Sequence, residues 1–127
     1  MNKKATQSLG RKVVTEVLGD GLQVTDTTVG KGDVAQRGDL VEVKYSGKLV
    51  TTGKEIDAGH IKFVLGAGSV IKGWDQGLQG LKVGGQRLLV VPPSLAYGDK
   101  AHGEVPAKST LEYEVELVNA KKPVQKN

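Results

Sequence analysis

The chain has 127 residues, contains no cysteine and carries a formal net charge of +4. This length is typical of one domain that can bury a hydrophobic core without disulfides. The missing cysteines exclude disulfides, thiolate nucleophiles and cysteine-ligated zinc. No apolar run approaches the roughly 20 residues of a membrane-spanning helix, and no apolar stretch follows the basic start as in a secretory signal. We therefore expect a cytoplasmic protein, with a nuclear location as the alternative.

The positive charge lies at the two ends of the chain. Residues 1–16 and residues 119–127 each carry a net charge of +3, which leaves the body between them slightly acidic. A nucleic-acid module gathers its lysines and arginines on a folded face, so we expect no nucleic-acid partner and no membrane partner. We predict a flexible basic segment at 1–19, one domain at 20–120 and a flexible basic tail at 121–127.

Runs rich in β-branched and alternating apolar residues predict strands, in chain order, at residues 22–29, 41–46, 61–65, 86–91 and 111–117. In the second and the last of these, the apolar side chains should face inward and the charged side chains should face water. Turns rich in glycine separate them.

The spacing of apolar residues predicts one helix, at residues 70–81. Its inward face would carry four residues at the helical period, namely Ile71, Trp74, Leu78 and Leu81. Ser69 is the predicted N-cap. Three glycines inside this helix each cost roughly 1 kcal/mol against alanine, so packing on a sheet must hold it. The predicted fold class is α+β, an antiparallel sheet covering one short helix.

Most enzyme classes lack their signature in this sequence. The histidines, His60 and His102, do not have metal-ligand spacing, and we expect both in surface loops. There is no nucleophile elbow and no phosphate-binding loop. A loop at 94–109 is longer than usual for a compact domain, and such loops are often functional.

The scarce aromatic residues are the other informative feature. There are five, Tyr45, Phe63, Trp74, Tyr97 and Tyr113. They could simply fill the core of a β-rich domain. However, the predicted helix and strands direct several of them to one place, and tyrosine and tryptophan suit a site that is half apolar and half wet.

Four short motifs carry a family resemblance. They are VIKGWDQGL at 70–78, VGG at 83–85, AYG at 96–98 and YSGKL at 45–49. Over residues 20–120 the chain closely resembles the FKBP family of peptidyl-prolyl cis-trans isomerases, the single-domain immunophilins. The resemblance implies a twisted five-stranded antiparallel sheet wrapped around one short helix. It also implies a monomeric enzyme that assists protein folding without a cofactor or metal.

The resemblance also implies the residues of the site, a pocket for a proline-containing segment of a client protein. Trp74 would be its floor, the Tyr97 hydroxyl and the Ile71 N–H would donate to substrate carbonyls, and Asp57 would be a buried polar group beside them. We assign the catalytic role to Asp57, Trp74 and Tyr97, and substrate binding to Tyr45, Ile56, Ile61, Val70, Ile71, Val105 and Tyr113. His102 matches the position of a loop histidine only weakly.

The sequence departs from the family pattern around this pocket. Ile56 and Ile61 stand where phenylalanine is common, Tyr113 replaces a frequent phenylalanine, and the segment between Asp57 and Ile61 is shorter. A lower, more aliphatic wall predicts reduced isomerase activity and weaker binding of macrolides such as tacrolimus or rapamycin. The alternative is a non-catalytic module that binds a protein partner through the same pocket or the 94–109 loop.

Overall fold

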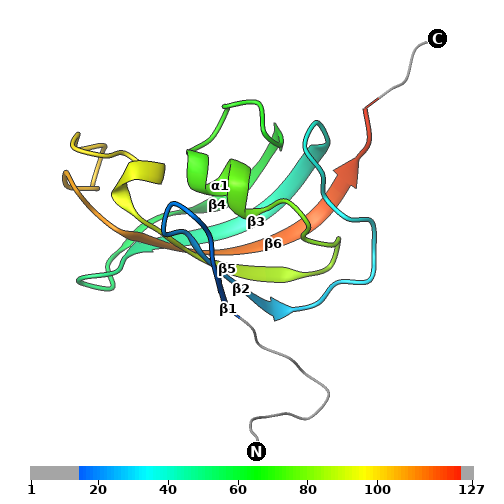
Figure 1. Cartoon of the computed structure of the whole chain (residues 1–127), viewed down its shortest axis with the longest axis horizontal. Helices are drawn as coiled ribbons and strands as arrows, with labels where there is room; N and C mark the ends of the chain where they lie inside the picture. Colours follow the sequence, from blue (N-terminus) through cyan, green and yellow to red (C-terminus); the bar gives the residue numbers. More distant parts are fainter. Residues whose placement is uncertain (1–14, 124–127) are drawn as a thin grey trace, which may run out of the picture.

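A computed structural model describes residues 15–123 of the chain. In this part, six antiparallel strands form one sheet in the order β1-β2-β5-β6-β3-β4, and one short α-helix accompanies them (Figure 1). The elements are β1 (Thr15–Val17), β2 (Gln23–Thr28), β3 (Leu40–Leu49), β4 (Glu55–Val64), α1 (Lys72–Gly77), β5 (Gln86–Val91) and β6 (Leu111–Lys121). The predicted α+β fold is confirmed, with β1 as a sixth strand.

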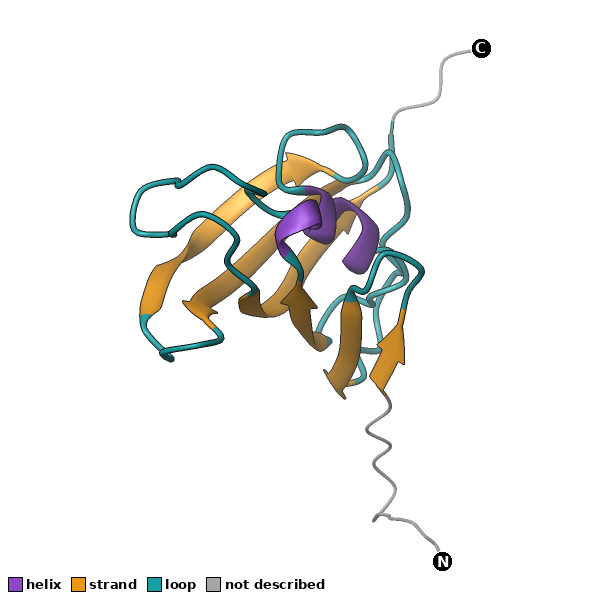
Figure 2. Ribbon diagram, turned by 60° about the vertical axis from the view of Figure 1, so that its left-hand side comes forward, coloured by secondary structure: helices purple, strands orange, loops and turns teal. Residues whose placement is uncertain are grey.

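The sheet bends around α1, which lies across its concave face (Figures 1 and 2). Alternate side chains of two neighbouring interior strands, β3 and β6, point to this face, and most of them are buried, as their alternation predicted. Because Leu111, Val115 and Leu117 alternate with glutamates, β6 buries one face and leaves the other to water. A single hydrophobic core therefore fills the space between the sheet and the helix.

Two strands differ from their predicted bounds. β1 lies within the segment predicted to be flexible, and it pairs with β2, where the hydroxyls of Thr15 and Thr25 are 2.6 Å apart. β4 is twice as long as predicted because its residues 57–64 pair without interruption with β3. His60 consequently lies on a strand and not in a loop. The flexibility predicted for 1–14 and 124–127 concerns residues outside the described part.

No helix in the described part of the chain is long and apolar enough to cross a membrane. Of the tail predicted at 121–127, the structure describes residues 121–123, and β6 ends at Lys121.

The helix is shorter than predicted and begins without a side-chain cap. It starts at Lys72, with Ile71 and not Ser69 at the N-cap position, and no side chain bonds to its first N–H groups. Instead, the Asp75 carboxylate reaches back and accepts hydrogen bonds from the Gly66 and Gly68 amides, at 2.8 and 2.9 Å. The carboxylate therefore fixes the loop that enters the helix.

Two helix glycines allow α1 to lie close to the sheet. A Cβ at Gly73 would be 2.5 Å from Val91 Cγ1, and one at Gly77 would be 2.8 Å from Leu89 Cδ2. The buried guanidinium of Arg87 then binds the end of the helix, donating to the Gly77 and Gln79 carbonyls at 2.8 and 2.9 Å. The glycines that weaken the helix thus permit the packing that holds it.

Gly73→Ala tests this balance. Alanine gains roughly 1 kcal/mol in helix propensity, but overpacking against Val91 costs about 1–3 kcal/mol, so we expect a net loss of stability. Chemical denaturation measures the free energy of unfolding. Gln76→Ala, on the exposed side of the same helix, is the control and should change it by less than about 0.5 kcal/mol. A Gly73→Ala protein more stable than wild type would contradict the close approach.

A buried carboxylate joins the start of β3 to the end of β6. Asp39 is 2% exposed and accepts hydrogen bonds from the Gln36 amide at 2.9 Å and from Lys122 Nζ at 2.8 Å. Lys122 also donates to the Val34 carbonyl at 2.7 Å. Burial alone raises the pKa of Asp39, but these two hydrogen bonds and the lysine charge outweigh it and hold the pKa below 3.8. Folding therefore favours the charged carboxylate.

This shift predicts how stability depends on pH. Since the unfolded chain takes up this proton at higher pH than the folded chain, the contribution of Asp39 is complete above about pH 5. It begins to fall near the unfolded pKa and is lost as the pH falls through the lower folded pKa. Asp39→Asn should cost roughly 1–3 kcal/mol at pH 7 and flatten the acid limb of unfolding free energy against pH. The exposed Asp99→Asn is the control. Equal acid limbs in wild type and Asp39→Asn would disprove the assignment.

Candidate functional site

A shallow pocket of about 190 Å³ opens beside the start of α1. Its walls come from β3, β4 and β6, from the loop that enters the helix, and from the loop after β5. The residues that line it are Tyr45, Asp57, Ile61, Ser69, Val70, Ile71, Trp74, Tyr97 and Tyr113. Eight of the ten residues predicted for the site therefore come together here.

Trp74 is the floor of this pocket. Its ring is 5% exposed, and Tyr45 and Tyr113 meet it edge-on, with ring centroids 4.9 and 5.2 Å away. Phe63 packs against the indole from the core at 5.8 Å. The buried Nε1–H of Trp74 has no hydrogen-bond partner among the described residues. Packing of aromatic rings, and not a hydrogen bond, therefore holds the indole in place.

Two strand glycines make room for the tyrosine rings. A Cβ at Gly47 would lie 2.4 Å from Tyr113 Cε1, and a Cβ at Gly59 would lie 3.2 Å from the Tyr45 hydroxyl. Each glycine is paired with its tyrosine across the sheet, Gly47 with Tyr113 and Gly59 with Tyr45. The two rings can therefore lie over the backbone of the neighbouring strand and still reach Trp74.

Asp57 stands at the rim of the pocket. It accepts a hydrogen bond from the Tyr45 hydroxyl at 3.2 Å. The residue is exposed, so the prediction of a buried polar group was wrong: on β4, the edge strand, nothing covers this side chain. Burial, the Asp57 charge and this hydrogen bond all raise the pKa of Tyr45, in that order. The phenol therefore remains protonated at neutral pH.

Tyr97 closes the pocket from the long loop. Its ring stacks on the His102 imidazole, with centroids 4.1 Å apart and planes inclined by 3°. His102 in turn exchanges two backbone hydrogen bonds of 2.8 Å with Val105. Burial raises the pKa of Tyr97, and the nearby Asp57 charge raises it further. The sequence matched His102 only weakly to the loop histidine of the family, and apart from that match only its place in the same loop as Tyr97 signals the stacking.

Three hydrogen-bond donors at the pocket have no internal acceptor among residues 15–123. They are the hydroxyls of Tyr97 and Tyr113 and the backbone N–H of Ile71. The Tyr45 hydroxyl, in contrast, is already donated to Asp57. An aromatic floor with free donors around it is suited to a small apolar ring that carries carbonyl groups on either side.

Two of the predicted residues lie outside the pocket. Val105 is 5% exposed and packs in the core below the long loop. Ile56 packs against the core at the irregularity where β4 leaves the regular register of β3. Ile61 alone therefore supplies the aliphatic wall from β4. Ser69, which the sequence predicted only as a helix cap, lines the pocket in addition.

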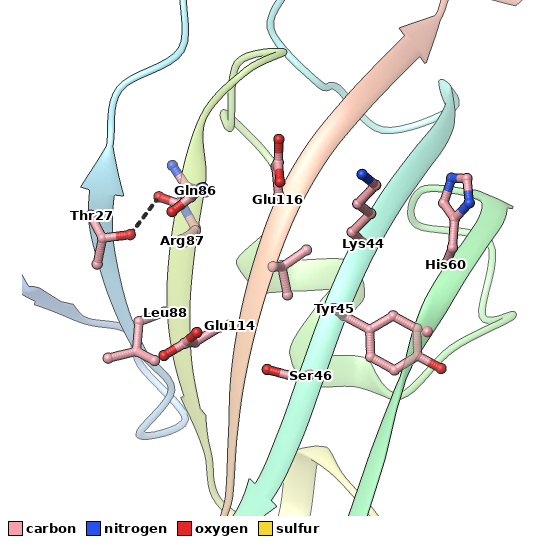
Figure 3. A pocket seen from close by; sticks show the side chains of 12 residues that line it. Thr27, Lys44, Tyr45, Ser46, His60, Gln86, Arg87, Leu88, Glu114 and Glu116 are labelled. Carbon is pink, nitrogen blue, oxygen red and sulfur yellow. Dashed lines mark hydrogen bonds between the residues drawn. The ribbon is translucent and has the colours of Figure 1, made fainter.

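A wider hollow of about 620 Å³ lies on the opposite face of the sheet (Figure 3). It crosses β2, β5, β6, β3 and β4, and Glu114, Glu116 and Lys44 point into it. Its surface is open and charged, and it has no aromatic floor. No group of three or more acidic, histidine or cysteine side chains in residues 15–123 is arranged to hold a metal ion.

The fold and this pocket define the class of protein to which the chain belongs. Residues 31–118 match the model of the FKBP-type peptidyl-prolyl cis-trans isomerase family. The chain belongs to this family, as its motifs predicted.

Individual relatives resemble different shares of the chain. FK506-binding protein 1A of Neurospora crassa is 48% identical over 109 residues, which cover 80% of this chain and 90% of that protein. FK506-binding protein 3 of Yarrowia lipolytica is 42% identical over 87% of this chain, but the chain spans only 28% of its length. The crystal structure of a peptidyl-prolyl cis-trans isomerase from Pseudomonas syringae superposes with a TM-score of 0.76 at 33% identity, covering 85% of this chain and 81% of that one.

Proposed function

We propose that the chain accelerates cis-trans rotation about X–Pro bonds in client proteins, and that the pocket over Trp74 performs this reaction. The observation that carries the proposal is the arrangement of this pocket. A buried indole with two edge-on tyrosines offers a flat apolar surface, and free N–H and O–H donors stand beside it.

The reaction requires no nucleophile. Rotation is slow because resonance makes the C–N bond partly double, with a barrier of about 18–20 kcal/mol. The twisted amide has a smaller dipole than the planar amide, so a dry pocket stabilises it relative to water. Fixed donors that meet the twisted amide more closely than the planar one add to the acceleration.

Each pocket residue then has a role in this mechanism. The proline ring rests on Trp74, while Val70 and Ile71 exclude water from its edges. The Ile71 N–H and the Tyr97 hydroxyl donate to carbonyls of the bound peptide, and burial keeps Tyr97 protonated. Asp57 fixes the Tyr45 hydroxyl and, through it, the orientation of the ring that meets Trp74.

Two variants test the mechanism in a protease-coupled assay on a short X–Pro peptide. Tyr97→Phe keeps the ring and its stacking on His102 but loses the donor, so we expect kcat/KM to fall by roughly threefold to tenfold. Trp74→Leu removes the floor and should lower kcat/KM by more than about tenfold. Gln76→Ala on the exposed side of α1 is the control.

Circular dichroism must show that each variant is folded. A folded Trp74→Leu protein with full activity would overturn the mechanism. If wild type binds an X–Pro peptide, seen as a change in Trp74 fluorescence, but does not accelerate its isomerisation, the chain is the alternative binding module. Trp74 is the sole tryptophan of the chain, so this signal has a single source.

We further propose that the same pocket binds macrolides such as tacrolimus with reduced affinity, and that the chain acts as a cytoplasmic monomer. The affinity argument depends on Ile61, which lines the pocket and is 36% exposed. An aliphatic side chain here offers a smaller contact surface than an aromatic one.

Ile61→Phe should therefore tighten macrolide binding by about threefold to tenfold, because an aromatic ring adds contact area and ring–ring attraction. Titration followed by Trp74 fluorescence measures the dissociation constant. Val64→Phe makes the same kind of change on the outer face of β4, away from the pocket, and should leave the affinity as in wild type. Equal affinities for wild type and Ile61→Phe would contradict the proposal.

A further inference from the structure

The hydroxyl of Tyr113 is an unused donor at the pocket. Tyr113 is 4% exposed as a residue, yet it lines the pocket, and its hydroxyl has no hydrogen-bond partner among residues 15–123. Within these residues, Trp74 Nε1 is the only buried side-chain polar atom without a partner, so the small exposed part of Tyr113 includes its hydroxyl. The donor is therefore available to a ligand in the pocket.

The Tyr113 ring is fixed in position. It stands edge-on to Trp74, with planes inclined by 89° and centroids 5.2 Å apart, and it lies 6.4 Å from the Tyr45 ring. On its other side it fills the space that a side chain at position 47 would occupy. The hydroxyl is consequently presented beside the indole with little freedom to turn away.

The hydroxyl is also a donor across the usable pH range. Burial raises the pKa of Tyr113, and the neighbouring Tyr97, Asp57 and Tyr45 raise it further. The Asp57 carboxylate accepts a hydrogen bond from the Tyr45 hydroxyl. Among residues 15–123, neither this carboxylate nor any other group accepts a hydrogen bond from the Tyr113 hydroxyl.

Building on the proposed function, we infer that Tyr113 is a substrate-binding residue whose hydroxyl donates a hydrogen bond to a peptide carbonyl attached to the proline ring. When that ring rests on Trp74, the nearest acceptors are two carbonyl oxygens. One belongs to the residue before proline and the other to proline itself. Each is two bonds from a ring atom, and Tyr113 lines the same pocket as the indole that supports the ring, with its own ring 5.2 Å from that indole.

This contact should serve binding more than the rate of rotation. As an amide twists, resonance is lost and its oxygen becomes less negative, so a donor that reaches this oxygen equally well in both states does not favour the twisted one. A donor to the carbonyl of proline itself is indifferent to the twist. In both cases the hydrogen bond stabilises the bound ground state at least as well as the transition state, and it lowers KM without raising kcat.

Tyr113→Phe is the test variant, with steady-state kinetics on a short X–Pro peptide as the measurement. We expect KM to rise by roughly threefold to tenfold with kcat unchanged or slightly higher. The melting temperature should stay level, since the hydroxyl makes no hydrogen bond within residues 15–123 that the variant could lose. Glu114→Gln, next along β6 and on the opposite face, is the matched control and should keep the wild-type KM.

Peptides with one carbonyl oxygen replaced by sulfur identify the acceptor, because sulfur accepts hydrogen bonds less well. Their dissociation constants, read from Trp74 fluorescence, are compared for wild type and Tyr113→Phe, first with sulfur before proline and then with sulfur on proline. The substitution that weakens binding to wild type but not to the variant marks the bonded oxygen.

The outcomes separate this inference from the proposed function. If KM of Tyr113→Phe equals that of an active wild type, or if both sulfur peptides weaken binding to the two proteins equally, the inference is wrong and the isomerase proposal stands. A lower kcat at unchanged KM also overturns it, since the hydroxyl would then act on the twisted amide. A wild type without isomerase activity defeats the proposed function itself, while the fluorescence titrations still test the Tyr113 contact.

Discussion

The close approach of α1 to the sheet determines how the core and the pocket are built. At Gly73 and Gly77 the helix backbone lies so near Val91 and Leu89 that a single methyl group would collide with them. A six-residue helix with two glycines has little stability of its own. Burial of Trp74 and Leu78, together with the Arg87 bonds to the end of the helix, therefore supplies the stability that the helix sequence lacks.

The same approach creates the site. Because the helix is short, the curved sheet extends beyond it (Figure 2). The pocket lies beside the start of the helix, with Trp74 as its floor. Glycines are also needed in the strands beside the pocket, because Gly47 and Gly59 leave space for the rings of Tyr113 and Tyr45. Backbone positions without side chains thus determine both where the helix lies and how the aromatic rings are arranged. Chemistry that needs only a dry surface and a few donors suits such a site.

Each correct and each wrong prediction of an element or of a residue's place has a physical reason. Alternation along β6 and the apolar run of β5 gave their inward faces and, for β5, its bounds, because a half-buried strand imposes a period of two. The helix was predicted too long because Leu78 and Leu81 are buried in the turn after it, where periodicity does not require helical hydrogen bonds. Asp57 was wrongly expected to be buried because exposure on an edge strand depends on which neighbours are absent, and no local pattern records that. His60 was expected in a loop because the pairing with β3 that extends β4 over it is a long-range contact.

The family, the antiparallel sheet with one helix and eight of the residues that meet at the pocket could be predicted from the sequence, since motifs and apolar periods are local properties of the chain. How these residues meet is visible in the three-dimensional structure alone. In the structure, Ile56 and Val105 lie outside the pocket wall, and His102 stacks on Tyr97. The Tyr45 hydroxyl donates to Asp57, whereas the Tyr113 hydroxyl has no partner among residues 15–123. These contacts join residues far apart in the chain, and their geometry follows from strand register and close packing, which no single segment encodes.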